Sequence, residues 1–296
     1  MLAVFGAVLC SHARNEPHSL YTYSFGGLED LEVSDSVALL DHLGYRGIAV
    51  EARGEESLER LDEYYEKSDQ VGEDFKIVAA YMAHQFSKYG FSDAEHRAAI
   101  DRLKGKDRAL WIWFKDDIQD GSVTDERVEV FVEGIFEYAL SKGVKIVLYP
   151  HYNTYYPTVS DALPLVEKIN HPDFGVAVNL FHEIMSDQAD VASLTRTIEL
   201  AKHRIAAVNL SGSLTELDRT SVSTINASAI LSLDESIYDL RPFMQLIKES
   251  GFEGPIGFIN YRLPQPEDYL KRTMKRWEEL CLEVGLYEEN FKEKTL

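Results

Sequence analysis

Residues 144–151, Val-Lys-Ile-Val-Leu-Tyr-Pro-His, decide the fold together with residues 174–182, Phe-Gly-Val-Ala-Val-Asn-Leu-Phe-His. Each stretch begins with a short, largely apolar run that is typical of a strand buried on both faces. Each places an imidazole and another polar group just past the carboxyl end of that strand. In a barrel of alternating strands and helices, active sites are built at this end. Carboxylates would be the natural metal ligands there, but the chain has the phenol of Tyr149 and the amide of Asn179.

Strand-like and helix-like segments alternate through the rest of the chain. The predicted strands are 20–25, 47–52, 76–82, 109–114, 144–149, 174–180, 205–210 and 255–259. The predicted helices are 35–43, 55–71, 93–103, 125–141, 160–169, 187–203, 234–250 and 266–284, several of which end at a glycine. This count and length predict a single α/β domain with the (β/α)8 TIM barrel architecture. A doubly wound open sheet is the alternative, but no Gly-rich turn follows the first strand and no Walker sequence is present.

Composition excludes some partners. The chain has 296 residues and a formal net charge of −20, so its surface repels a phosphate backbone and nucleic acid is not an expected partner. No segment after the amino terminus is long and apolar enough to span a membrane. Two cysteines at opposite ends, Cys10 and Cys281, do not indicate a disulfide framework, and Cys281 is predicted to be a small core residue. A homo-oligomer is compatible with this composition.

The amino terminus is treated separately from the barrel. An apolar run at residues 2–9, followed by Ser11-His12-Ala13, resembles the core and cleavage site of a secretory signal, although no positive charge precedes it. The alternative is a first strand in a chain whose start is misassigned. We therefore predict a signal peptide or disordered terminus at residues 1–13 and a barrel at 18–288. A signal would send the protein to the periplasm or outside the cell, and without one it would be cytoplasmic.

Four strand-end residues are candidates for proton transfer. His151 and His182 follow adjacent strands, and imidazole titrates near neutral pH, although a lone strand-end histidine is more often structural. Glu51 is the one carboxylate directly at a strand end and a candidate general base; alternatively it forms an ion pair with Arg53. Tyr149 is a candidate acid or hydrogen-bond donor, or else part of an aromatic wall that stacks on a sugar ring.

Five further residues are candidates for substrate binding. Asn179, Asn209 and Asn260 close three successive strands, and an uncharged amide offers both donors and an acceptor to the vicinal hydroxyls of a sugar or polyol. Each could instead satisfy loop backbone, as asparagine commonly does. Lys115 and Arg262 could bind an anionic group or stabilise an enolate. For Lys115 the alternative is a solvated, charged turn.

Several of these segments together resemble the sugar phosphate isomerase/epimerase group, which has a xylose-isomerase-like TIM barrel. The resemblance covers nearly the whole chain after about residue 18, in keeping with the barrel predicted above. It rests on the order and spacing of residues 30–43, Gly44-Tyr45-Arg46-Gly47-Ile48, Tyr149-Pro150-His151, Asn179-Leu180-Phe181-His182 and Gly254-Pro255-Ile256-Gly257-Phe258. It implies a carbohydrate pocket at the carboxyl ends of the strands.

The resemblance also implies a divalent metal, held in that family by a glutamate, an aspartate, a histidine and a second glutamate at successive strand ends. The corresponding positions here are Tyr149, Asn179, Asn209 and either Ile259 or Asn260. His151 and His182 remain as flanking histidines, whereas a catalytic zinc site, for comparison, uses about three protein ligands. Neutral amides bind hard divalent cations far more weakly than carboxylates do. We therefore assign no metal ligands and predict no cofactor firmly.

Two main functions follow from the resemblance and the strand-end residues. The first is an isomerase- or epimerase-like enzyme that moves a proton next to the carbonyl of a sugar or keto-sugar. The second is a carbohydrate-binding barrel that has lost catalysis, because a fold does not by itself imply a function. A lyase or hydrolase of oxidised glycosides and a subunit completed by a partner chain are weaker alternatives. The expected partner in each case is a small-molecule carbohydrate.

Overall fold

The computed structural model of the protein describes residues 18–72, 74–104, 108–115, 117–118, 120–186, 190–214, 229–263 and 265–286. The predicted signal or disordered segment at residues 1–13 lies outside them. Among the described residues, no helix combines the length and apolar character needed to cross a membrane.

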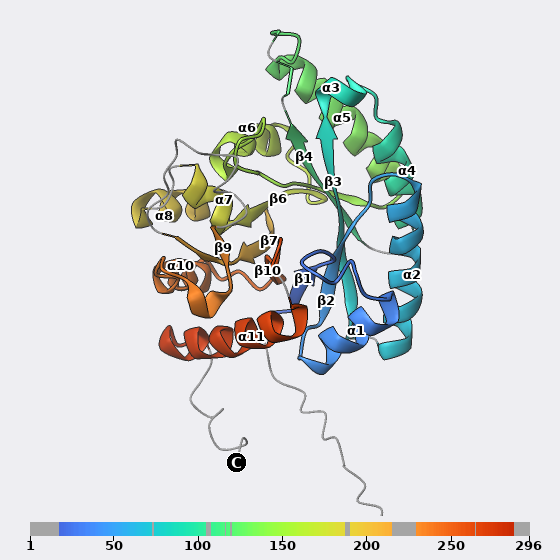
Figure 1. The fold of residues 1–296 in the computed structure, drawn as a ribbon. Helices are drawn as coiled ribbons and strands as arrows, with labels where there is room; N and C mark the ends of the chain where they lie inside the picture. Colours follow the sequence, from blue (N-terminus) through green and yellow to red (C-terminus); the bar gives the residue numbers. More distant parts are fainter. Residues whose placement is uncertain are drawn as a thin grey trace, which may run out of the picture.

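Eight parallel strands form a closed barrel in the order β1-β10-β7-β6-β5-β4-β3-β2 (Figure 1). The strands are β1 (Leu20–Tyr23), β2 (Gly47–Glu51), β3 (Lys76–Gln85), β4 (Ala109–Lys115), β5 (Lys145–Leu148), β6 (Phe174–Asn179), β7 (Ile205–Leu210) and β10 (Ile256–Phe258). Each strand pairs with its neighbour in the chain, and β10 closes the ring on β1. The predicted single-domain (β/α)8 architecture is confirmed.

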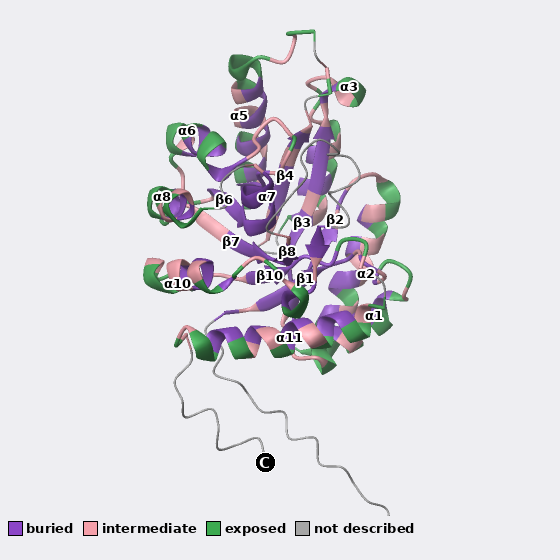
Figure 2. Cartoon of the chain, turned by 60° about the vertical axis from the view of Figure 1, so that its left-hand side comes forward, coloured by how far each residue is buried: buried purple, intermediate pink, exposed green. Residues whose placement is uncertain are grey.

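In the described part of the chain, eight longer helices lie outside the strands. They are α1 (Val33–His42), α2 (Glu55–Val71), α4 (Ala94–Leu103), α5 (Asp125–Ser141), α6 (Val159–Ile169), α8 (Val191–Ala201), α10 (Arg241–Ser250) and α11 (Pro266–Glu283). Figure 2 shows that the strands are almost wholly buried, whereas each outer helix has one buried and one exposed face. This is the pattern expected when one apolar stripe of each helix packs on the sheet.

Three short helical segments and a small hairpin sit at the strand ends. They are α3 (Phe86–Tyr89), α7 (Leu180–Met185), η2 (Leu233–Glu235) and the antiparallel pair of β8 (Gly212–Ser213) and β9 (Ile230–Leu231). The predicted strand 174–180 therefore ends one residue early. The reason is that the side chain of Asn179 accepts a hydrogen bond from the N–H of Phe181 (3.1 Å) and so caps α7.

Two other predicted boundaries were wrong. The predicted helix 234–250 is divided into η2 and α10, and a proline, Pro242, lies in the first turn of α10, where its missing N–H costs nothing. The third strand runs past its predicted end at Met82 to Gln85, because Ala83 to Gln85 pair with Trp113 to Lys115 of β4.

The interior of the barrel is a separate apolar cluster from the layer between strands and helices. Its buried members include Tyr21, Tyr23, Ala49, Ala79, Trp111, Val147, Tyr149, Ala177 and Phe181. The small side chains of Ala49, Ala79 and Ala177 leave room, so a few aromatic rings fill the space. Gly257 makes room for one of them, since a Cβ there would lie 2.2 Å from Cζ of Tyr21.

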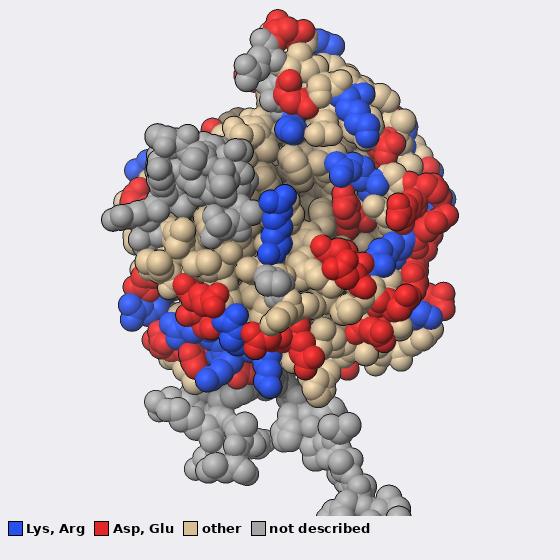
Figure 3. All heavy atoms as spheres, in the orientation of Figure 1, with Lys and Arg blue, Asp and Glu red and all other residues tan. Residues whose placement is uncertain are grey.

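The surface in Figure 3 carries acidic side chains densely on the right-hand side, over α2, in keeping with the net charge of −20. The same face is hollowed near its middle, where uncharged residues are bordered by basic and acidic ones.

Candidate functional site

The carboxyl ends of the strands form a mouth lined by aromatic side chains. Phe25, Tyr81, Trp113 and Tyr152 are half-buried and pack on the interior cluster. Phe25 stacks on Tyr23 (ring centroids 4.9 Å apart) and meets Tyr81 edge to face at 6.0 Å. We refer to these four half-buried side chains as the aromatic mouth.

Beneath the aromatic mouth, three of the predicted site residues belong to one buried hydrogen-bond network. Asn179 donates through Nδ2 to the Tyr149 hydroxyl (2.5 Å), whose oxygen lies 3.2 Å from that of Tyr23. The hydroxyls of Tyr23 and Tyr21 both donate to Asn209 Oδ1, at 2.7 and 2.6 Å. Five side chains from β1, β5, β6 and β7 thus form a continuous line.

The amides and Tyr23 define the partners in this network. Tyr23 has a single proton and faces two acceptors, Asn209 Oδ1 at 2.7 Å and the Tyr149 oxygen at 3.2 Å. At the other end, Asn179 Oδ1 accepts from the backbone N–H of Phe181, which turns its amide nitrogen toward the Tyr149 oxygen. Burial raises the pKa of Tyr149 to about 12, so the phenol is neutral.

The two predicted histidines are in contact. The rings of His151 and His182 have centroids 3.8 Å apart at an angle of 37°, and His151 also stacks on Trp113 at 4.7 Å. The His182 ring meets Tyr149 edge to face at 5.9 Å, which joins the pair to the buried network. His182 is buried, and its Nδ1 has no hydrogen-bond partner among the residues that the structure describes, whereas His151 is half-buried.

Both imidazoles are neutral at pH 7. Burial lowers the pKa of His151 to about 4, partly opposed by the hydrogen bond to the Tyr152 carbonyl. Burial, and then the proximity of His151, lower the pKa of His182 well below its usual value. His151 Nδ1 lies 3.0 Å from the Tyr152 carbonyl oxygen, which can only accept, so Nδ1 carries the proton and Nε2 is left with a lone pair. The arrangement provides one neutral base.

Other predicted site residues lie apart from this group. Glu51 forms the anticipated ion pair with Arg53 (3.2 Å), and both side chains are more than a third exposed. Lys115 ends β4 and is half-buried. Arg262 is exposed, has a left-handed backbone (φ 58°) and lies over the ring of Tyr261 at 5.3 Å.

Asn260 does not join the network of the other two asparagines. Its Nδ2 donates to the carbonyl oxygens of Phe25 (2.5 Å) and Tyr23 (3.3 Å), so it fastens the end of β1 to the end of β10. Its Oδ1 is buried and has no hydrogen-bond partner within the described part of the chain. This is the backbone-satisfying role that asparagine often takes.

Tyr21, Tyr23 and Trp113 were not predicted as site residues. The signal that would have found them is alternation: in a barrel strand every second side chain faces the interior. Tyr21 and Tyr23 flank Thr22, and Trp113 follows Trp111 on the same side of β4.

A closed ring of eight parallel strands surrounded by helices, with polar side chains at the carboxyl ends, defines a TIM barrel. Residues 114–280, more than half of the chain, match the family model of the xylose isomerase-like TIM barrel. The chain belongs to this family. No curated protein matches it by sequence.

Solved structures of similar shape share little sequence with the chain. A Sinorhizobium meliloti protein is 16% identical with a TM-score of 0.68, covering 90% of this chain and 99% of its own. The IolI protein with a bound zinc atom is 15% identical, with a TM-score of 0.67 and coverages of 92% and 99%. The 3-keto-D-glucoside 4-epimerase YcjR of E. coli is 9% identical, with a TM-score of 0.65 and coverages of 90% and 99%. At these identities the likeness concerns the fold.

The residues at the expected metal positions do not fit a divalent cation. Tyr149, Asn179 and Asn209 are neutral, and their oxygens already accept hydrogen bonds from Asn179 Nδ2, the Phe181 N–H and the hydroxyls of Tyr21 and Tyr23 respectively. Within the described part of the chain, no group of three or more His, Cys, Asp or Glu side chains is arranged to hold a metal ion. Hard divalent cations require anionic oxygens at such a site.

Proposed function

We propose that this barrel binds a sugar or keto-sugar at the aromatic mouth and moves a proton next to its carbonyl without a metal, with His151 as the base. The observation that carries the proposal is the His151–His182 pair, in which a half-buried, neutral imidazole has its Nδ1 proton fixed by a carbonyl. The fold family and the epimerases among similarly shaped proteins support the substrate class.

The aromatic mouth suits a carbohydrate. A sugar ring has apolar C–H faces and polar edges, so it stacks on flat rings while its hydroxyls seek hydrogen bonds. Trp113 provides such a surface against the His151 ring, and Phe25 and Tyr81, which meet edge to face, provide further aromatic surface. A bound ring would displace water from these aromatic groups.

His151 has the lone pair that proton abstraction needs. Burial holds the pKa of this imidazole at about 4, so the lone pair on Nε2 is present at neutral pH, and the low pKa also makes His151 a weaker base than a free imidazole. The enolate that results needs stabilisation by a positive group. Lys115 and Arg262 are our candidates, and Glu51 is a second carboxylate base whose charge is balanced by Arg53.

The test is hydrogen exchange in D2O. The protein is incubated with a panel of aldoses, ketoses and keto-sugars, and incorporation of deuterium next to the carbonyl is followed by NMR. We expect exchange with at least one sugar, and His151→Gln should slow it by about 10²–10⁴-fold, the usual contribution of a general base. The matched control is His42→Gln, at the exposed end of α1.

A second function, carbohydrate binding without turnover, is favoured by one observation. Tyr149, Asn179 and Asn209 stand where the family resemblance implies carboxylates. They belong to one hydrogen-bond network inside the barrel, in which Tyr23 joins Asn209 to Tyr149. If sugars raise the melting temperature but no exchange occurs, this second function replaces the first. If no sugar binds at all, both are wrong.

A further inference from the structure

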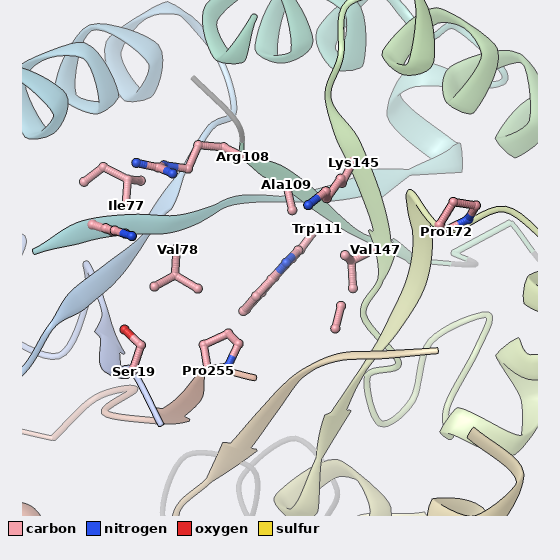
Figure 4. A pocket seen from close by; sticks show the side chains of 12 residues that line it. Ser19, Ile77, Val78, Arg108, Ala109, Trp111, Lys145, Val147, Pro172 and Pro255 are labelled. Atoms are coloured by element: carbon pink, nitrogen blue, oxygen red, sulfur yellow. The ribbon is translucent and has the colours of Figure 1, made fainter. Parts of the chain in front are cut away.

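A cavity of about 380 Å³ opens at the opposite end of the barrel from the aromatic mouth (Figure 4). All of its lining comes from the starts of the strands, the turns before them, and the barrel interior just inside. The lining residues are Ser19, Lys76, Ile77, Val78, Arg108, Ala109, Trp111, Lys145, Val147, Pro172, Ala206 and Pro255. We refer to this cavity as the basal pocket. None of the residues named in the proposed function takes part in it.

The charged residues that line the basal pocket in the described part of the chain are all basic. Lys76, Arg108 and Lys145 line it, and no aspartate or glutamate does so among the described residues. This contrasts with the whole chain, in which 50 acidic residues outnumber 30 lysines and arginines. Arg108 and Lys145 begin neighbouring strands, and the backbone N–H of Lys145 donates to the Arg108 carbonyl (3.2 Å). The two cationic side chains therefore start from adjacent points of one edge.

The rest of the basal pocket is apolar. Figure 4 shows Trp111 lying across its middle, with Val78, Val147 and Pro255 around it and with Arg108 and Lys145 on one side. Trp111 is almost wholly buried, and its other neighbours are Tyr21 and Tyr149 of the interior cluster. An occupant would meet a flat aromatic and aliphatic floor together with a cationic edge.

We propose that the basal pocket is a second binding site, for a small organic anion that has an aromatic or aliphatic body and a phosphate or carboxylate group. The apolar floor would take the body, and the three cationic side chains would pair with the anionic group. A volume of about 380 Å³ is within the range of small-molecule sites, roughly 300–1,000 Å³, and too small for a polymer.

The probe for the test is phenyl phosphate, titrated into the full-length protein by calorimetry. Inorganic phosphate and benzyl alcohol serve as the two half-probes. We expect phenyl phosphate to bind at least tenfold more tightly than either, and its affinity to fall as NaCl is added, because ion pairs near the surface are screened. Equal affinity for benzyl alcohol, or no binding of phenyl phosphate, would overturn the proposal.

Variants place the binding in the basal pocket. The double variant Lys76→Gln/Lys145→Gln should lower the affinity at least tenfold, whereas the control Lys202→Gln/Lys275→Gln, in exposed helical segments, should leave it unchanged. Ala206→Leu keeps all the charges but fills part of the space, and it should also weaken binding. Unchanged affinity in the first and third variants would contradict the proposal.

One further variant separates this site from the aromatic mouth. His151→Gln should bind phenyl phosphate as the wild type does, because the basal pocket contains no atom of His151. Loss of binding in this variant, with Lys76→Gln/Lys145→Gln unaffected, would place the anion at the mouth and overturn the second site. Failure of sugar exchange would leave this result untouched.

Discussion

The two ends of the barrel interior differ in charge and in how their polar groups are used. Below the aromatic mouth, Tyr149, Asn179 and Asn209 are neutral and bonded to one another. At the basal pocket, Lys76 and Lys145 are on exposed strand starts above an apolar floor. Trp111 lies between the ends and stacks on Tyr149 with ring centroids 6.0 Å apart and planes 10° from parallel.

The comparison shows that the carboxyl and amino ends of the same eight strands can carry different kinds of side chains. TIM-barrel chemistry is normally found at the carboxyl ends of the strands, and the amino ends serve stability. Here the centre of the carboxyl end is itself closed by a stabilising network. What remains for recognition there is a ring of aromatic groups and one histidine pair, while the amino end holds a charged pocket.

The largest change in stability should come from removing Asn209, the acceptor that Tyr21 and Tyr23 share. Asn209→Leu would leave the Tyr21 hydroxyl buried without an acceptor and the Tyr23 hydroxyl with only its 3.2 Å contact to Tyr149. At about 1–3 kcal/mol for each buried group that loses its acceptor, we expect the free energy of unfolding to fall by roughly 1–6 kcal/mol in urea denaturation. The control is Tyr21→Phe, which removes one donor and should cost only about 0.5–1.5 kcal/mol. Equal losses in the two variants would show that Asn209 does not anchor the network.

A smaller effect concerns the pH dependence of stability at the mouth. Because the folded-state pKa of His151 is depressed to about 4, the unfolded chain binds more protons between pH 6.5 and 4, and stability falls as pH falls through this window. In the His151→Gln variant, the free energy of unfolding should fall less steeply with falling pH, by up to about 1.4 kcal/mol per pH unit. Denaturation at several pH values measures this slope. A change at the basal pocket, Lys76→Gln, should leave the slope as it is.

The slope of His151→Gln must be compared with that of the wild type, because other buried groups also change the free energy of unfolding in this pH range. Burial lowers the pKa of His96 to about 3 and raises that of Glu183 to about 7. The histidine adds to the loss of stability in acid. The glutamate acts in the opposite direction, since its contribution is complete below pH 4.5 and is lost as pH rises through 7. A slope in His151→Gln equal to that of the wild type would mean that His151 is not held neutral by the fold.

The smallest effect should be that of a chelator. Since the expected ligand positions are neutral and bonded to one another, EDTA should change neither the melting temperature nor the sugar exchange rate beyond experimental error. Elemental analysis of the gently purified protein should show no stoichiometric metal. A melting temperature that falls in EDTA and recovers with added Mn²⁺ or Zn²⁺ would contradict our reading of the site.

The strand ends could be predicted from sequence because apolar runs of four to seven residues and the polar residues after them have a regular spacing. His151 and His182 were placed on neighbouring strands, and they are in contact. The hydrogen-bond partners of each asparagine amide could not be predicted. Asn209 and Asn260 look alike in the sequence, but one lies within a strand and faces Tyr21, whereas the other follows a strand and is bonded to backbone. That difference depends on register between strands distant in the chain.

The buried line from Asn179 to Asn209 has one further consequence. Neither amide can flip without giving up a bond to the Phe181 N–H or to two phenols, so we expect both amides to stay in place. Tyr149 is therefore held from the side of the aromatic mouth, and Trp111 stacks on its ring from the side of the basal pocket. We expect an occupant of the basal pocket to meet a stiff ceiling, because Trp111 has little room to move toward Tyr149.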